Sequence, residues 1–224
     1  MKKNNLLLIL LAVALVASGI EILYLKKGLK DAPTSVDESA IVLKNIHNRK
    51  SVRKYTDQSV PDSLIHTILK AGMAAPSGHD ARPWQFIVIR DKAVMKKLRS
   101  KLEWARGLDY STVAIVVCGD MRKVNPKNKE FWITDCSAAT ENILLATEAL
   151  GLGAVWSTLY PGEDRMQHTR DVLQLPDYLM PLCILPMGYP LEETKPKDKF
   201  DPKRIHWESY QENEQGEVKV QDQE

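Results

Sequence analysis

Arg49-Lys50-Ser51-Val52-Arg53, with Tyr55 close behind, is the stretch around which we expect this chain to be organised. It places two guanidinium groups, an ammonium group and a hydroxyl within five residues. Arginine carries a planar fork of donors that suits phosphate or carboxylate, and it stays charged. If the segment is extended, Arg49, Ser51 and Arg53 lie on one side and Lys50 and Val52 on the other. The stretch indicates an anion-binding segment, with a solvated basic loop as the alternative.

The composition is that of an ordinary globular protein. The 224 residues are 44% hydrophobic and 27% charged, which suits one substantial domain with extensions. The formal net charge of +2 gives no support for bulk electrostatic binding to nucleic acid or acidic lipid.

The cysteines and histidines do not predict a metal site. Cys118, Cys136 and Cys183 are an odd number of cysteines without metal-ligand spacing, and we expect them to be small core residues without a disulfide. His79 and the other histidines lack partners at metal-ligand spacing.

The N-terminal segment, residues 1–29, is dominated by an apolar run from Leu6 to Ile20 that continues past Glu21. A membrane-spanning helix needs about 20 apolar residues, which this run just reaches if Glu21 lies near the headgroups. We predict an uncleaved membrane anchor. The alternative is export, with cleavage near Ala17-Ser18-Gly19.

Composition shifts divide the rest of the chain. We predict a linker at residues 30–36, a folded domain at 37–210 and a polar, disordered tail at 211–224. Ser35 to Glu38 has the pattern of a capping box that starts the first helix of the domain, which ends near Asn48.

Helical and strand patterns then alternate, which predicts an α/β or α+β class. Apolar spacing and stop signals predict helices at 62–72, 91–104, 131–150 and 163–173. Runs rich in β-branched and apolar residues predict strands at 85–89, 112–118, 154–159 and 182–187. The continuous apolar character of 112–118 is typical of a strand covered on both faces.

Three later blocks follow the basic stretch in order. They are Ala75-Pro76-Ser77-Gly78-His79-Asp80-Ala81-Arg82-Pro83-Trp84, then Gly151-Leu152-Gly153-Ala154-Val155-Trp156, then Met187-Gly188-Tyr189-Pro190. With the basic stretch, and over nearly all of the chain after residue 40, they resemble the nitroreductase family of FMN-dependent oxidoreductases. The resemblance implies a mixed, mainly antiparallel sheet between helices, and a homodimer with FMN at the subunit interface. It also implies a C-terminal extension, here Leu191 to Tyr210, that embraces the partner.

The resemblance assigns the cofactor-binding residues. Arg49, Ser51 and Arg53 would hold the flavin phosphate, ribityl chain and pyrimidine edge, with Lys50 in the same stretch. Other residues would line the ring or reach the phosphate: Pro76, Ser77, Gly78, Asp80, Trp156, Ser157, Thr158 and Lys199. Gly78 suits a place where the backbone approaches a ring closely. Each block also has an alternative without a cofactor: an ordinary Pro-Gly turn, a core tryptophan or a solvated lysine.

The chain departs from the family at Asp80, where an asparagine is common, and at Arg82, where a glutamine usually precedes Pro-Trp. An ionised carboxylate only accepts hydrogen bonds, so Asp80 facing the ring would disfavour the anionic reduced flavin. Arg82 could offset that charge or hold Asp80 away as an ion pair.

The implied reaction passes a hydride from NADH or NADPH through flavin N5 to an electron-poor acceptor, such as a nitro-compound or quinone, in a ping-pong cycle. The cofactor supplies this chemistry, so we expect no dedicated catalytic acid or base. One alternative is reductive dehalogenation or flavin fragmentation on the same scaffold. Another is a membrane-tethered flavin redox module with little turnover.

Overall fold

The computed structural model describes residues 37–210. These residues divide into two compact units between Lys44 and Asn45, within helix α2 (Glu38–Asn48). Asp37 begins this helix, since its carboxylate accepts hydrogen bonds from the backbone N–H groups of Ser39 (3.0 Å) and Ala40 (3.3 Å). The Ser39 side chain also donates to it and lowers the pKa of Asp37. Asp37 is therefore the observed cap; Ser35, where we predicted the cap, lies outside the described residues.

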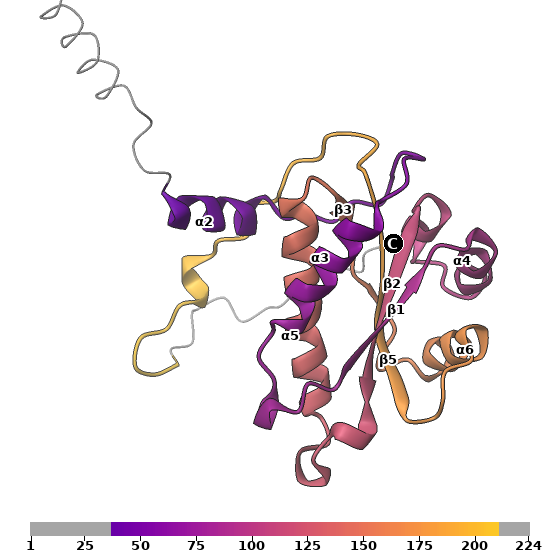
Figure 1. The fold of residues 1–224 in the computed structure, drawn as a ribbon. Coiled ribbons are helices and arrows are strands. Elements are labelled where there is room, and N and C mark those ends of the chain that lie inside the picture. The colour runs from indigo at the N-terminus through magenta and orange to yellow at the C-terminus, as the bar shows by residue number, and fades with distance from the viewer. Residues whose placement is uncertain (1–36, 211–224) are drawn as a thin grey trace, which may run out of the picture. The chain divides into compact units, whose positions relative to one another are not determined.

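The centre of the second unit is a five-stranded sheet in the order β1-β2-β5-β3, with β4 also paired to β5 (Figure 1). All of these strand pairs are antiparallel. The strands are β1 (Trp84–Ile89), β2 (Val113–Asp120), β3 (Gly153–Ala154), β4 (Ser157–Thr158) and β5 (Leu179–Gly188). The sheet lies between helices, as the family resemblance implies for the fold.

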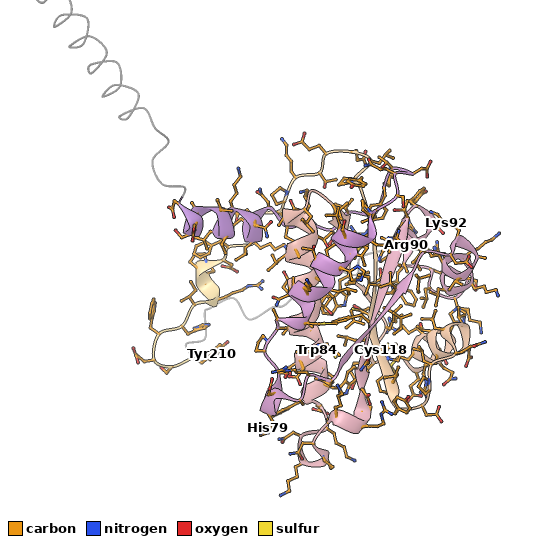
Figure 2. The ribbon with its side chains drawn as sticks, viewed as in Figure 1. His79, Trp84, Arg90, Lys92, Cys118 and Tyr210 are labelled. Atoms are coloured by element: carbon orange, nitrogen blue, oxygen red, sulfur yellow. The ribbon has the colours of Figure 1, made fainter. Side chains whose placement is uncertain are left out.

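Helices cover both faces of the sheet. Figure 1 shows α3 (Asp62–Met73) and α5 (Phe131–Ala149) on one side, and α4 (Lys92–Arg99) and α6 (Glu163–Leu173) on the other. The side chains of β2 alternate between the two cores: Val113, Ile115 and Val117 pack in one, and Ala114, Val116 and Cys118 in the other. Figure 2 shows Cys118 inside the sheet. The prediction that this strand is covered on both faces is confirmed.

Short 3₁₀ turns connect these elements. They are η1 (Gly78–Asp80), η2 (Arg106–Asp109), η3 (Met121–Lys123), η4 (Pro126–Asn128) and η5 (Pro202–Arg204).

Two elements differ from the sequence prediction. Helix α4 ends at Arg99, before the expected end at 104, because the chain turns there to bury Leu102 and Ala105 completely. The expected strand at 154–159 is two short pieces, β3 and β4, because each pairs separately with β5.

The membrane prediction needs correction. No helix within residues 37–210 is both long and apolar enough to cross a membrane. The expected anchor, residues 1–29, lies outside the described residues. The prediction of a membrane-anchored localisation is corrected on the finding for the described residues.

The basic stretch is fastened to the sheet by Val52 and Tyr55. Val52 is buried, and its N–H donates to the Ala154 carbonyl (2.9 Å). A Cβ on Gly153 would lie 2.6 Å from the Cβ of Val52, so only glycine leaves room for this contact. The buried Tyr55 hydroxyl lies 2.5 and 2.8 Å from the carbonyl oxygens of Val52 and Pro186, and burial raises the pKa of Tyr55.

We therefore expect Gly153→Ala to lower the free energy of unfolding by about 1–3 kcal/mol, because the added methyl overpacks this contact. Urea denaturation measures the change. Combining it with Val52→Ala should recover part of the loss, since the smaller side chain makes room. Strictly additive losses would contradict this packing.

Candidate functional site

The basic stretch presents Ser51 and Arg53 outward on either side of the buried Val52, as the expected alternation requires. Ser51 forms a parallel bridge with Ala154, which makes the otherwise antiparallel sheet mixed at this edge. Arg53 is exposed and makes no hydrogen bond or ion pair with the other described residues. Its five donors are therefore available to an anion.

The other two cations of the stretch contact helix α5. The Nε of Arg49 pairs with Glu141 (2.9 Å), which leaves its terminal nitrogens without a partner among the described residues. The ammonium of Lys50 pairs with Glu148 (2.9 Å), and both side chains are largely shielded. Arg49 can still bind a phosphate; Lys50 is held in a structural ion pair, and its cofactor role stays a prediction.

Residues 156–158 continue from the same edge of the sheet. Trp156 is half-buried and packs on the core, Ser157 is buried and Thr158 is exposed. Close by lies Gly107, on which a Cβ would come within 3.2 Å of Val155. The preceding Arg106 is exposed and adds a cation beside this edge. No sequence motif pointed to Arg106, because only tertiary packing brings it here.

The Pro76–Arg82 segment is built on the beginning of α5. The Gly78 N–H donates to the carboxylate of Asp135 (2.8 Å), which is only 5% exposed. A Cβ on Gly78 would lie 2.5 Å from the ring of Phe131. The expected close approach to a ring is therefore present, and the ring it meets within the chain is that of Phe131. Pro76 is exposed, and the Ser77 hydroxyl accepts from the Arg82 N–H (3.0 Å).

Asp80 and Arg82 form an exposed, two-pronged ion pair, with Nε–Oδ1 at 2.6 Å and Nη2–Oδ2 at 2.7 Å. Of the two roles considered for Arg82, the structure shows the ion pair. His79, Asp80 and Arg82 all have positive φ angles, of 56°, 55° and 45°. A residue other than glycine at such a φ angle carries roughly 1 kcal/mol or more of backbone strain, and strain of this kind is frequent at functional sites.

The basic stretch and the Pro76–Arg82 segment contact α5 at different positions along its axis. Gly78 binds Asp135, whereas Arg49 and Lys50 bind Glu141 and Glu148. At the rise of an α-helix, about 1.5 Å per residue, Asp135 and Glu148 lie about 20 Å apart. The structure thus brings the basic stretch together with Ala154, and it places Arg49 and Lys50 at other positions along α5 than Gly78.

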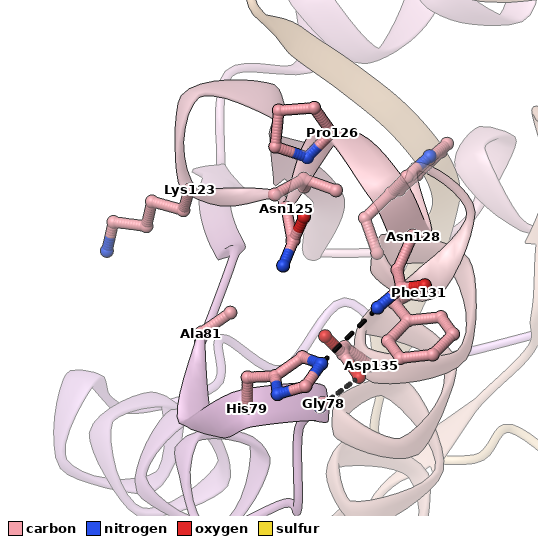
Figure 3. Close-up of a pocket in the computed structure, with 11 residues that line it drawn as sticks. Gly78, His79, Ala81, Lys123, Asn125, Pro126, Asn128, Phe131 and Asp135 are labelled. Carbon is pink, nitrogen blue, oxygen red and sulfur yellow. Dashed lines mark hydrogen bonds between the residues drawn. The ribbon is translucent and has the colours of Figure 1, made fainter.

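A cavity of about 410 Å³ opens between the 76–82 segment, the loop after β2 and the start of α5 (Figure 3). Its lining includes His79, Asn125, Asn128, Phe131 and Asp135. The His79 ring stacks on Phe131, and its Nε2 lies 3.3 Å from the amide nitrogen of Asn128.

The loop over this cavity is anchored by a buried carboxylate. Asp120, 1% exposed, accepts from Nε (2.9 Å) and Nη2 (2.7 Å) of Arg122. The guanidinium also lies 3.6 Å over the ring of Tyr178. These contacts fix the chain where it leaves β2.

Two further groups lie away from the cavity. Lys199 is exposed in the segment after Pro190 and makes no hydrogen bond or ion pair with other described residues, so its role on the phosphate stays a prediction. The three cysteines are free and buried, as expected. Burial raises the pKa of Cys118 to about 12 and raises the pKa values of Cys136 and Cys183 as well.

Comparison with known proteins decides the family. The sequence matches the Nitroreductase family over residues 46–105 and 99–189. A candidate NADH dehydrogenase/NAD(P)H nitroreductase from Methanothermobacter thermautotrophicus is 44% identical over 169 residues, covering 75% of this chain and 87% of that protein. The chain belongs to the nitroreductase family.

Solved structures agree with this assignment. A candidate NADH dehydrogenase/NAD(P)H nitroreductase from Parabacteroides distasonis is 46% identical, with a TM-score of 0.72 over 75% of this nitroreductase and 98% of that chain. An FMN-dependent nitroreductase from Clostridium difficile is 30% identical, with a TM-score of 0.69 over 75% and 99% of the two chains. The family that the four short sequence blocks indicated is confirmed, and so is the nitroreductase-like fold.

The Asp120–Arg122 pair gives a pH-dependent prediction. The hydrogen bonds from Arg122 are the main cause of the lowered pKa of Asp120, whose ordinary value is 3.8. The stability from this carboxylate is fully present above that ordinary value and is lost as pH falls through the lower folded-state pKa. Arg122→Met should therefore destabilise the protein more at pH 7 than at pH 3, as measured by urea midpoints. Lys129→Met removes an exposed cation of the same loop that does not act on Asp120, and it should show no such dependence. An equal loss for Arg122→Met at both pH values would contradict the pairing.

Proposed function

We propose that this nitroreductase passes a hydride from NAD(P)H to an electron-poor acceptor, such as a nitro-compound or quinone, in a ping-pong cycle. The enzyme is an FMN-dependent NAD(P)H oxidoreductase, in line with its family. The observation that carries the proposal is the outward donor set of the basic stretch, Ser51 and Arg53, beside the free terminal nitrogens of Arg49. When bound, FMN supplies the hydride chemistry, and the protein supplies binding, orientation and electrostatics.

These donors fit FMN. The phosphate and the carbonyl edge of the flavin are acceptors, and guanidinium groups that lack an internal partner can satisfy them. Val52 and Tyr55 hold the backbone between these donors rigid, so little ordering is needed on binding. Thr158 and the exposed edge after Trp156 would line one side of the ring.

The Pro76–Asp80 segment would line the ring from a second subunit. Within one chain this segment lies about 9–20 Å along α5 from the residues that hold Arg49 and Lys50. A homodimer would bring the segment of one subunit to the basic stretch of the other. The Asp80–Arg82 pair would then present almost no net charge to the flavin.

The segment from Leu191 to Tyr210 would embrace the partner. Its start is held by hydrogen bonds from Leu191 N–H to Lys54 carbonyl (3.1 Å) and from Thr56 N–H to Tyr189 carbonyl (2.9 Å). Beyond that point large apolar side chains are exposed in the single chain, including Phe200 (76%) and Trp207 (80%). Figure 2 shows Tyr210 at the end of this segment. Exposed apolar groups on this scale mark an interaction surface.

The first test concerns the cofactor. Purified protein should show the absorbance of oxidised flavin, and Arg49→Ala/Arg53→Ala should weaken FMN binding at least about tenfold, because each lost charge-assisted bond costs about 1.5–3 kcal/mol. Fluorescence titration of FMN measures this. Lys54→Ala, an exposed neighbouring cation, should bind as the wild type does. Folded protein that takes up no FMN would overturn the proposal.

The second test concerns the dimer. Phe200→Ser/Trp207→Ser should shift the protein from dimer to monomer at micromolar concentration and lower its FMN content, because the two side chains would be buried against the partner. Light scattering measures the mass. Val88→Ser, an exposed apolar change on β1, is the matched control. A double variant that stays dimeric with full FMN content would count against the embracing segment.

A further inference from the structure

The cavity beside the Pro76–Arg82 segment contains a carboxylate oxygen that makes no hydrogen bond with the described residues. Asp135 is only 5% exposed, and the bond from Gly78 uses Oδ1. The other oxygen makes no hydrogen bond with any described residue, yet it is not sealed in, since Asp135 lines the cavity. This oxygen is therefore an acceptor that a molecule entering the cavity can reach with a hydrogen-bond donor.

An amide donor faces the same space. The Asn125 oxygen accepts from the Lys127 N–H (2.9 Å), which fixes the orientation of the amide and leaves its NH₂ group without a partner among the described residues. Figure 3 shows this nitrogen and the Asp135 carboxylate pointing into the space between the loop and the Gly78–Ala81 turn.

The other polar groups of the lining are engaged or turned away. The amide nitrogen of Asn128 lies against Nε2 of His79, and the ammonium of Lys123 points away from Asn125 and Asp135 in Figure 3. The remaining lining is mostly apolar, with the rings of Phe131 and Trp132 among it. A volume of about 410 Å³ suits one small aromatic molecule.

We infer that this cavity selects the electron acceptor, and that the acceptor is a small planar aromatic with two polar ends. One end is the electron-poor group, a nitro or carbonyl oxygen that accepts from the Asn125 amide. The other end is a hydroxyl or N–H substituent that donates to the free oxygen of Asp135. This inference rests on the proposed function, because it takes the 76–82 segment to lie beside the flavin.

The test compares two neutral probes, 4-nitrobenzyl alcohol and its methyl ether, in which a methyl group replaces the hydrogen of the donor. Dissociation constants are measured on the oxidised holoenzyme without NAD(P)H, and kcat/KM with it. Wild type should prefer the alcohol by about tenfold or more, because a hydrogen bond to a charged group is worth at least that factor. Equal affinity for both probes would overturn the inference.

Two variants test the contacts at the two ends of the acceptor separately. Asp135→Asn keeps an amide oxygen for the Gly78 N–H but turns the free acceptor into a donor, so the preference for the alcohol should vanish. Asn125→Asp keeps the oxygen that Lys127 needs but removes the NH₂ donor, so both probes should weaken by about tenfold with their ratio unchanged. Glu130→Gln, at the start of α5 and outside this cavity lining, should change neither value. A preference that survives Asp135→Asn, or an Asn125→Asp variant that binds both probes normally, would refute the assignment.

The experiment distinguishes a failure of the proposed function from a failure of this inference. If the wild type takes up no FMN, that function is wrong, and the same binding comparison is then made on the apoprotein, because every lining residue comes from one chain.

Discussion

The contact between Val52 and Gly153 is the constraint on which the functional end of this protein depends. A side chain at 153 would push the basic stretch off the sheet, and with it the Val52–Ala154 hydrogen bond. While the contact holds, Val52 is the buried member of an alternating segment, and Ser51 and Arg53 must face outward. The glycine-rich block and the basic block, about a hundred residues apart in the sequence, therefore act as one structural unit.

Helix α5 organises the rest. Its buried side packs on the sheet and on α3, where a Cβ on Gly72 would lie 2.8 Å from Ile143. Its carboxylates hold the basic stretch at one level and the Gly78 turn at another. A single long helix thus sets the distance between the two groups of residues that we propose to meet at the flavin across a dimer interface.

Much of the fold could be read from local pattern. The limits of α5 and α6 follow from Gly151, Pro176 and apolar spacing, and β2 from its continuous apolar run. Other features could not be read from local pattern. Pairing with β5 decides the strand order and the division of residues 153–158, and burial of Leu102 decides the early end of α4. The same holds for the site: the motifs indicated Arg53 and Gly78, but no local pattern indicates Asp135. Its contact with Gly78 joins residues far apart in the sequence.

The burial of the cysteines has a chemical consequence for an enzyme that handles electrophiles. Thiolates, and not thiols, are the nucleophiles that attack quinones and partly reduced nitro-compounds. All three cysteines of the chain are shielded from solvent, and burial keeps their sulfurs protonated at neutral pH. The protein therefore offers no sulfur nucleophile to the acceptors that we propose for it, and repeated turnover should not end in self-arylation.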